Sequence, residues 1–431
     1  MTRVQGLAPR FAAWRVLHDV RHGVPFDIAL GRAMVDLEPD DRRLAHELAA
    51  GVFRSRSQLD RTLGGVIDRG LESVRPDALD VLRIGAFQLL NLDRVPAHAA
   101  VQTTVDVARR IGGDRIAGFV NAVLRKLTTP APEAALGPTD LAERHSHPPW
   151  LVTRWRERFG VAATTALLEW NNTRPPLVIQ PARWSRARLE AALSDRGIEF
   201  RPAPHDAGLV VTFGRPTELP GFVEGAFLVQ DPAQRLVVRY LAPEPDTVVY
   251  DACAAPGGKS VAIGEVAGRV IAADRTFNRV RRLSETITRA GSNRIFVVQA
   301  DAEHPPVRGV DAVMLDVPCL GTGAFARNPD ARWRVTPEAL TTLTAQGGRL
   351  LRATAEVVRP GGLLLFATCS LEPEENEAQI ERFLTEDRRF RREPSTEVAT
   401  ELLTTAGDLG LFPQRHGTDG AYAARLRKIA G

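Results

Sequence analysis

Three cysteines stand out in the sequence because each closely follows a short apolar run in the C-terminal part of the chain. A thiolate is a strong nucleophile, and a partly accessible cysteine near positive charge or a helix start is reactive. By chemistry alone both Cys319 and Cys369 could attack a substrate, whereas Cys253 fits better as a small apolar side chain in a loop. An odd number of cysteines in a long chain argues against a disulfide framework and for the reducing cytoplasm, and their spacing fits no zinc site. The three segments are VVYDACAAPGGKS (248–260), MLDVPCLGTG (314–323) and GGLLLFATCS (361–370).

The first of these segments contains DACAAPGGKS, which has the features of a cofactor loop between a strand and a helix. Gly257 and Gly258 would let the backbone pass close to a ligand, and a helix N-terminus favours an anionic group such as a carboxylate. The loop is not a GxGxxG fingerprint. It is also not a P-loop, which would need glycine where Cys253 stands.

Two acidic residues follow the next two apolar runs. Asp274 stands where an acidic residue usually accepts hydrogen bonds from ribose hydroxyls, and Asp301 could reach an adenine amino group. Taken singly, either acid could be an ordinary turn or cap residue. Together with the glycine loop they suit an adenosine without phosphates, which favours S-adenosylmethionine over NAD or ATP. The predicted cofactor-binding residues are Cys253, Ala254, Ala255, Pro256, Gly257, Gly258, Lys259, Asp274, Arg279, Asp301 and Asp316, and no metal site is predicted.

These loops need a sheet that brings the ends of several strands to one edge. Short runs rich in β-branched residues alternate with helical stretches such as 277–290 and 338–358. This pattern predicts a doubly wound, Rossmann-like α/β domain over residues 236–431, with parallel strands buried on both faces and ligands at their carboxyl ends. The predicted strands are 247–251, 269–274, 294–299, 310–316 and 362–368.

The N-terminal part of the chain is typical of a helical bundle. Apolar residues recur at helical spacing, as in 116–127, and proline and glycine breaks separate six or seven helices. We therefore predict an all-α bundle over residues 1–129, a linker over 130–144 and a small α+β subdomain over 145–235.

The overall composition is that of a globular protein, with 44% hydrophobic and 25% charged residues. The net charge of +4 is a mild basic excess, which is compatible with nucleic acid binding without proving it. No apolar stretch reaches the length of a membrane span, and the N-terminus lacks the pattern of a signal peptide. We expect a cytoplasmic protein with no membrane partner.

Three long motifs, in the same order along the chain, resemble those of the RNA cytosine-C5 methyltransferases. They are DACAAPGGKS, LDVPCLGTGAFARNPDARW and FATCSLEPEENE, and FVEGAFLVQDPAQ and PQRHGTDGAYAARLRK are also similar. The helical N-terminal part resembles the NusB-like RNA-binding domain, and the combination resembles the small-subunit ribosomal RNA methyltransferase B family of the Sun or Fmu type. This resemblance implies an S-adenosylmethionine-dependent enzyme that methylates C5 of a cytosine in 16S rRNA, free or in early assembly, and that does not act on DNA.

The chemistry of this reaction explains why two cysteines are needed. C5 of cytosine is a poor nucleophile, and addition of a thiolate to C6 makes it able to attack a methyl sulfonium. The C5 proton must then be removed and the thiolate expelled. A Pro-Cys pair like that of DNA cytosine methyltransferases would nominate Cys319 as the nucleophile. The resemblance to the RNA family instead assigns attack to Cys369 and product release to Cys319, with Asp316 holding or protonating N3 and Lys259 supporting the pocket.

Several basic and aromatic residues could contact RNA, although each could equally belong to an ordinary surface or core. Arg327, Arg332 and Trp333 could bind phosphate or stack on a base. A second group near the end of the helical part could bind phosphates, namely Arg109, Arg110, Arg115, Arg125 and Lys126.

The sequence departs from the family pattern at Gln180, Leu320 and Ala326. Because substrate positioning could be affected, two alternatives stay open. One is the same chemistry on tRNA or another RNA, and the other is a catalytically impaired RNA-binding or assembly protein.

Overall fold

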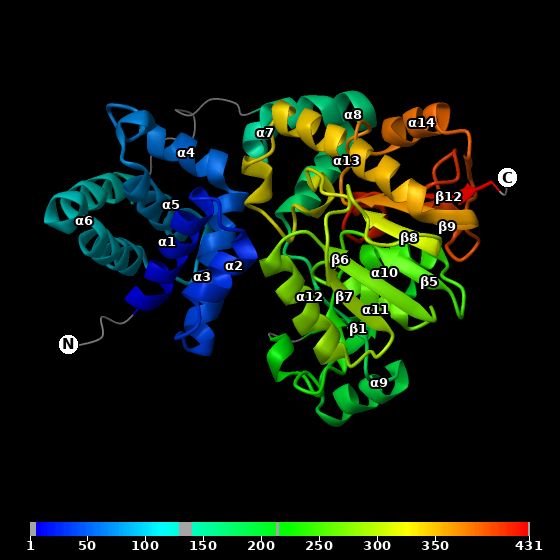
Figure 1. Ribbon diagram of the computed structural model, residues 1–431. Coiled ribbons are helices and arrows are strands. Elements are labelled where there is room, and N and C mark those ends of the chain that lie inside the picture. Colours follow the sequence, from blue (N-terminus) through cyan, green and yellow to red (C-terminus); the bar gives the residue numbers. More distant parts are fainter. Residues whose placement is uncertain (1–5, 129–139, 213–214, 430–431) are drawn as a thin grey trace. The chain divides into compact units, whose positions relative to one another are not determined.

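The computed structural model describes residues 6–128, 140–212 and 215–429, and their contacts divide the chain into two compact units (Figure 1). The first unit runs to Thr173 and also contains Phe325–Arg334, whereas the second comprises Arg174–Ala324 and the residues from Val335 onward. No helix in these described ranges is long and apolar enough to cross a membrane. Most of the predicted linker, residues 130–139, lies outside the described residues, as does residue 129.

The first unit is built from helices, which confirms the predicted all-α bundle. Proline occupies the first position of several of them, where its fixed φ and missing N–H favour a helix start. Side chains such as Leu48, Leu82 and Leu124 are fully buried between them. The helices are α1 (Leu7–Arg21), α2 (Phe26–Ala33), α3 (Pro39–Arg54), α4 (Arg56–Gly64), α5 (Pro76–Asn91), α6 (Ala97–Leu127), α7 (Leu141–Arg144) and α8 (Pro149–Asn172).

Two details of this unit differ from the sequence pattern. Gly113, with a φ of 74°, interrupts α6, so that the apolar stripe at 116–127 belongs to a separate helical segment. The end of the predicted linker forms α7, which begins where Asp140 Oδ1 accepts a hydrogen bond from the Glu143 N–H at 2.7 Å. Contacts group α7 and α8 with this unit, whereas the sequence pattern assigns α7 to the linker and α8 to the α+β subdomain.

A short segment from late in the chain, Phe325–Arg334, completes the first unit. The side chain of Arg332 is fully buried and donates hydrogen bonds to Asn172 Oδ1 at 2.6 Å and to the Asn171 carbonyl at 2.7 Å. The Trp333 indole N–H donates to the Phe53 carbonyl at 2.8 Å. The hypothesis that Arg332 contacts RNA is therefore wrong, because its guanidinium is used inside the unit, and Trp333 packs against the helical core.

Replacing Arg332 by alanine is expected to destabilise the first unit. Burial lowers the pKa of Arg332 to about 9, and loss of the guanidinium would leave the Asn171 carbonyl and the Asn172 side chain without its hydrogen bonds. We expect a loss of about 3–5 kcal/mol in the free energy of unfolding, measured by urea titration followed by far-ultraviolet circular dichroism. Arg43→Ala is a matched control, because Arg43 forms an exposed ion pair with Asp40, and it should change stability by less than about 1 kcal/mol. Equal effects of the two substitutions would contradict the prediction.

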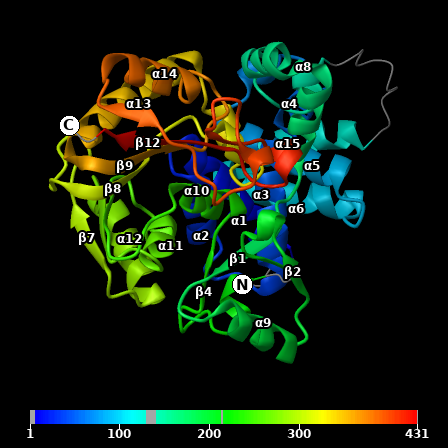
Figure 2. The same ribbon diagram turned by 90° about the vertical axis from the view of Figure 1, so that its right-hand side faces the viewer.

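The second unit contains a small sheet in the strand order β2-β3-β1-β4, all antiparallel where paired. Figure 2 shows its helix, α9 (Arg186–Asp195), beside these strands. Ser185 starts α9 by accepting the Arg188 N–H. The departure at Gln180 lies in this sheet, where its buried amide donates to the Ala207 carbonyl at 2.8 Å. The strands are β1 (Leu177–Pro181), β2 (Phe200–Pro202), β3 (Leu209–Val211) and β4 (Phe227–Val229).

The large sheet of the second unit has the order β10-β12-β9-β8-β5-β6-β7, with β11 paired to β12. The five predicted strands are present and pair in parallel, which confirms the α/β fold. The sequence did not predict β10, β11 and β12, and β12 joins β9 antiparallel, so the sheet is mixed rather than parallel. The strands are β5 (Val248–Asp251), β6 (Arg269–Asp274), β7 (Ile295–Gln299), β8 (Val310–Asp316), β9 (Val358–Thr368), β10 (Phe390–Arg392), β11 (Leu409–Leu411) and β12 (Ala421–Lys428).

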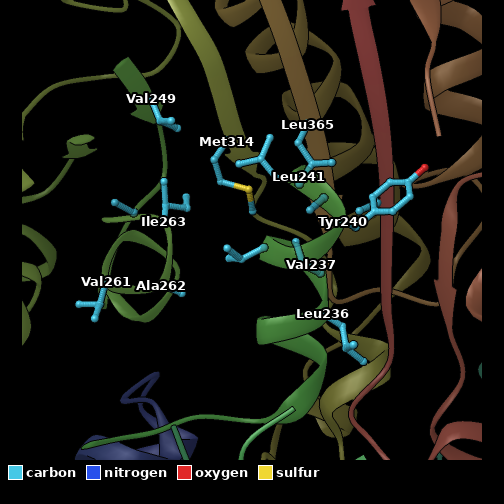
Figure 3. Packing of buried hydrophobic residues seen from close by; sticks show 14 of the residues in the cluster. Leu236, Val237, Tyr240, Leu241, Val249, Val261, Ala262, Ile263, Met314 and Leu365 are labelled. Carbon is cyan, nitrogen blue, oxygen red and sulfur yellow. The ribbon is translucent and has the colours of Figure 1, made fainter. Parts of the chain in front are cut away.

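Helices cover both faces of this sheet, and successive strand residues point to opposite sides. On one face, α10 (Pro232–Leu241), α11 (Gly258–Gly264) and α12 (Phe277–Ala290) pack on residues such as Met314 and Leu365 (Figure 3). The other face is covered by α13 (Pro337–Val357) and α14 (Glu377–Glu386) (Figure 1). These helices pack on the neighbouring residues Leu315 and Phe366. This double burial fixes the strands whose carboxyl ends carry the candidate site.

Candidate active site

The sheet brings the second and third cysteines together. Strands β8 and β9 are parallel neighbours, and Asp316 at the end of β8 is in register with Ala367 of β9. Cys319 lies three residues past Asp316, and Cys369 lies two residues past Ala367. Both cysteines are half-buried, and their Sγ atoms are 3.5 Å apart, within hydrogen-bond distance for sulfur.

The environment of Cys319 favours its protonated thiol. The hydrogen bond shared with Cys369, together with burial, raises the pKa of Cys319 well above its usual value. A raised pKa disfavours the thiolate, which is the attacking species.

Hydrogen bonds hold the two cysteine-bearing segments in this arrangement. The Gly323 N–H donates to the Cys369 carbonyl at 2.9 Å, and the Leu371 N–H donates to Thr322 Oγ1 at 2.8 Å. Gly323 must be glycine here, because a Cβ atom would lie 2.6 Å from the Gly420 Cα. The distance between the thiols is thus set by backbone packing rather than by flexible side chains.

A partly buried ion pair lies next to the cysteines. The Lys259 ammonium donates to Asp316 Oδ2 at 2.6 Å and also to the Gln234 side chain. Burial disfavours the ammonium, but attraction to Asp316, with a smaller contribution from Cys369, outweighs burial and raises the pKa of Lys259. Lys259 therefore stays charged, which gives the site a positive charge close to Cys369.

The loop after β5 has the close backbone packing expected of a ligand loop. Gly257 has a φ of 108°, and a Cβ atom at Gly258 would lie 2.6 Å from the Gln230 side chain. Asp251, at the end of β5, accepts a hydrogen bond from Ser260 Oγ at 2.6 Å through Oδ2. Its other oxygen, Oδ1, is buried and has no hydrogen-bond partner among the residues that the structure describes. Burial raises the pKa of Asp251 to about 7.

A cavity of about 400 Å³ lies between this loop and the cysteines. Asp274 and Asp301 line it, and Asp274 is held by the Arg275 N–H and by Arg279 Nε, both at 2.8 Å. The predicted residues that line the cavity are Cys253, Ala255, Asp274, Arg279, Asp301, Asp316, Cys319 and Cys369.

Some predicted residues do not line the cavity themselves. Lys259 binds Asp316, which lines it, and Gly257 and Gly258 form the turn of the loop after β5. The remaining ones, Ala254 and Pro256, belong to the same loop. The sequence did not single out Gln346 and Leu350 of α13, which line the cavity, because a single side chain of a long helix carries no local signal. It also did not single out Glu375, although that residue lies within a quoted motif.

Models of three protein families match successive parts of the chain. The NusB family matches residues 8–129, and the ferredoxin-like domain of RsmF/B-like methyltransferases matches residues 147–217. The model described as 16S rRNA methyltransferase RsmB/F matches residues 238–427.

Curated relatives match the chain over nearly its whole length. A probable ribosomal RNA small subunit methyltransferase B of Synechocystis is 36% identical over 98% of this chain and 100% of the relative. The ribosomal RNA small subunit methyltransferase B of Pasteurella multocida is 33% identical over 93% of each chain. The chain belongs to this family. It is therefore an S-adenosylmethionine-dependent methyltransferase.

Solved structures share the fold of this methyltransferase B family member. The crystal structure of PH0851 has a TM-score of 0.86 at 23% identity and covers 98% of this chain and 99% of its own. The structure of NSun6 from Pyrococcus horikoshii, solved with SFG, has a TM-score of 0.59 at 20% identity and covers 66% of this chain and 99% of its own.

The residues of the methyltransferase B site fit S-adenosylmethionine. Asp251 offers a buried unpaired oxygen to a cationic amino group, and Asp274 and Asp301 offer carboxylates at the ends of successive strands. When bound, the cofactor supplies an electrophilic methyl group on a sulfonium. These acidic side chains would hold it, and the thiol pair lines the same cavity.

Substituting Asp251 by asparagine in this methyltransferase is expected to change how stability depends on pH. The pKa of Asp251 is raised to about 7 in the folded state, so between about pH 4 and 7 the folded state binds more protons than the unfolded state, and the free energy of unfolding falls as pH rises. Asparagine does not titrate, so the variant does not lose stability in this way. The free energy of unfolding of the variant minus that of the wild type should therefore increase by about 2–4 kcal/mol between pH 4 and 8, as measured by urea titration. Asp195→Asn, at an exposed position, should show no such trend. A difference that is the same at every pH would show that Asp251 titrates normally.

Proposed function

We propose that this enzyme transfers a methyl group to C5 of a cytosine in small-subunit ribosomal RNA through a transient bond between Cys369 Sγ and C6 of the base. The observation that carries the proposal is the pair of thiols 3.5 Å apart on the wall of the cofactor cavity. A second cysteine beside a nucleophilic one has no role in simple methyl transfer, but it has one where a covalent intermediate must be resolved. The names of the curated relatives support small-subunit rRNA as the substrate class.

The first step is attack by Cys369. The target base leaves its stack and enters the cavity. The Cys369 thiolate bonds to C6, and the electrons of the C5–C6 double bond move to C5, which takes the methyl group from the sulfonium. The neighbouring charge of Lys259 favours the thiolate, and the protonated Cys319 can donate a hydrogen bond to it.

The pyrimidine ring needs a partner at N3 as the thiolate adds. Asp316 lies at the end of β8 on the wall of the cavity and is held by Lys259 at 2.6 Å. In the proposed reaction it holds or protonates N3, so that charge arising on the ring is stabilised next to the reacting carbons.

The last step is release of the product. A base takes the proton on C5, the electrons of that C–H bond re-form the C5–C6 double bond, and the bond between C6 and Cys369 Sγ breaks, so that Cys369 leaves as a thiolate. We assign assistance of this step to Cys319, because it lies beside the sulfur atom that must leave.

Basic residues of the first unit support RNA as the partner. Arg109, Arg110, Arg115, Arg125 and Lys126 are all exposed. Exposed cations bind phosphates without reading sequence, so they contribute affinity rather than choice of cytosine. We place the reaction in the cytoplasm, where thiols stay reduced, on rRNA that is free or in early assembly rather than on DNA.

Bisulfite mapping of RNA tests this function. We expect rRNA from a strain that lacks the gene to have lost one 5-methylcytosine in the small subunit, and the wild-type gene to restore it where a Cys369→Ala gene does not. Loss of a methylcytosine from tRNA instead would transfer the activity to that substrate. If purified protein binds RNA and the cofactor but incorporates no tritiated methyl group into any bulk RNA, it is a binding or assembly protein.

A further inference from the structure

A buried carboxylate links the two cysteine-bearing segments and has no part in the chemistry described above. Glu375 lies in the turn between β9 and α14, and only about 3% of its surface is exposed. Its two oxygens accept hydrogen bonds from the Leu320 N–H at 3.0 and 3.3 Å. Leu320 directly follows Cys319, and the two partners are 55 residues apart in sequence.

The same carboxylate also contacts the other cysteine segment. The side chain of Ser370, next to Cys369, interacts with the Glu375 carboxylate and lowers its pKa, which favours the charged form. Glu375 thus interacts with the residue after one cysteine and with the residue after the other. A carboxylate suits this position because it has only acceptors and can serve both donors at once.

The turn that carries Glu375 is itself fixed. Asn376 Nδ2 donates to the Ser370 carbonyl at 2.9 Å, and Asn376 Oδ1 accepts from Thr368 Oγ1 at 2.5 Å. All three residues are buried. A displacement of the Glu375 carboxylate would therefore move the segment with Cys319 rather than the rigid turn.

Burial of this carboxylate works against stability. Burial raises the pKa of Glu375 to about 7, although the interactions with Ser370 and Leu320 lower it. Its charge also helps to raise the pKa of the neighbouring Cys319. A costly buried acid close to a reacting group is typical of functional sites rather than of ordinary cores.

We infer that Glu375 is a positioning residue for Cys319: by holding the Leu320 N–H, it keeps the Cys319 thiol beside Cys369 for product release. The inference rests on the proposed role of Cys319. It predicts that loss of Glu375 slows release of the methylated RNA and leaves cofactor binding and the first methyl transfer nearly unchanged, because these steps need Cys369, Lys259 and Asp316.

The test separates methyl transfer from release. Under single-turnover conditions, with tritiated S-adenosylmethionine and rRNA, we expect Glu375→Ala to transfer the methyl group at a rate within about 3-fold of the wild type and to release it about 10–100-fold more slowly. The delay should appear as a covalent protein–RNA band on a denaturing gel. Glu375→Gln keeps one acceptor for the Leu320 N–H and should recover most of the release rate, which a general loss of packing would not explain.

Two further variants make the outcome decisive. Glu386→Ala removes an exposed carboxylate at the end of α14 and should behave as the wild type. Cys319→Ala is the reference for blocked release. If Cys319→Ala traps the band and Glu375→Ala does not, the role of Glu375 is overturned while the proposed function stands. If Cys319→Ala itself traps nothing, the proposed role of Cys319 fails, and the inference fails with it.

Discussion

A Cys369→Ala enzyme is expected to bind S-adenosylmethionine with normal affinity and to transfer no methyl group to RNA. Without the sulfur atom, C6 cannot be attacked, and C5 stays too weak a nucleophile to take the methyl group. Cys319 is a poor substitute, because burial and the nearby Glu375 and Asp316 still raise its pKa after the hydrogen bond with Cys369 is lost. We expect methyl incorporation into rRNA to fall by about 10⁴-fold or more, measured with tritiated cofactor.

Two controls separate this loss from damage to the fold. Cofactor affinity, measured by calorimetry, should stay within about 3-fold of the wild type, and the urea midpoint should be nearly unchanged, because Cys369 is half-buried and its removal leaves only a small gap beside the cavity. A Cys369→Ala enzyme that methylates rRNA at even a tenth of the normal rate would exclude a covalent role for this residue.

The Cys319→Ala enzyme should behave in the opposite way and accumulate a covalent complex with RNA. Its Cys369 thiol can still attack and C5 can still be methylated, but release loses its assisting group. We expect most of the enzyme to migrate with RNA on a denaturing gel after incubation with rRNA and cofactor, whereas the wild-type complex should be hard to detect.

The double variant Cys319→Ala with Cys369→Ala identifies the attacking sulfur. It should form no complex, since the bond to C6 requires Cys369. A complex that forms in Cys369→Ala and is lost in Cys319→Ala would reverse the two roles, as the Pro-Cys pair by itself suggests.

The strands that carry the site could be predicted from sequence because their apolar runs are short and buried on both faces. The antiparallel strands β10, β11 and β12, which extend one edge of the sheet, could not be predicted in this way. In β12, charged residues interrupt the apolar pattern, and they are accommodated only by distant partners. Arg425 and Arg427, for example, both pair with Glu393.

Contacts between residues that are far apart in the sequence could not be predicted either. The motif around Arg332 and Trp333 contains basic and aromatic residues, which on local grounds favour RNA contact. In the structure Arg332 is bonded to a residue 160 positions away and Trp333 to one 280 positions away. Likewise, the partner of Glu375 is a backbone N–H, which has no signature in the sequence. Local patterns therefore singled out the candidate reacting side chains but not the groups that hold them.

The placement of Phe325–Arg334 in the first unit has a consequence for biosynthesis. A nascent chain emerges from the ribosome in order, so α1–α8 are outside long before residue 334 appears. Until then, Arg332 and Trp333 cannot pack into the helical unit. The Asn171 carbonyl lacks its hydrogen bond from Arg332, and the Phe53 carbonyl lacks its hydrogen bond from Trp333. The helical half thus reaches its final form only once the chain has passed the Cys319 motif, and a gene fragment that stops at residue 173 would encode an incomplete domain.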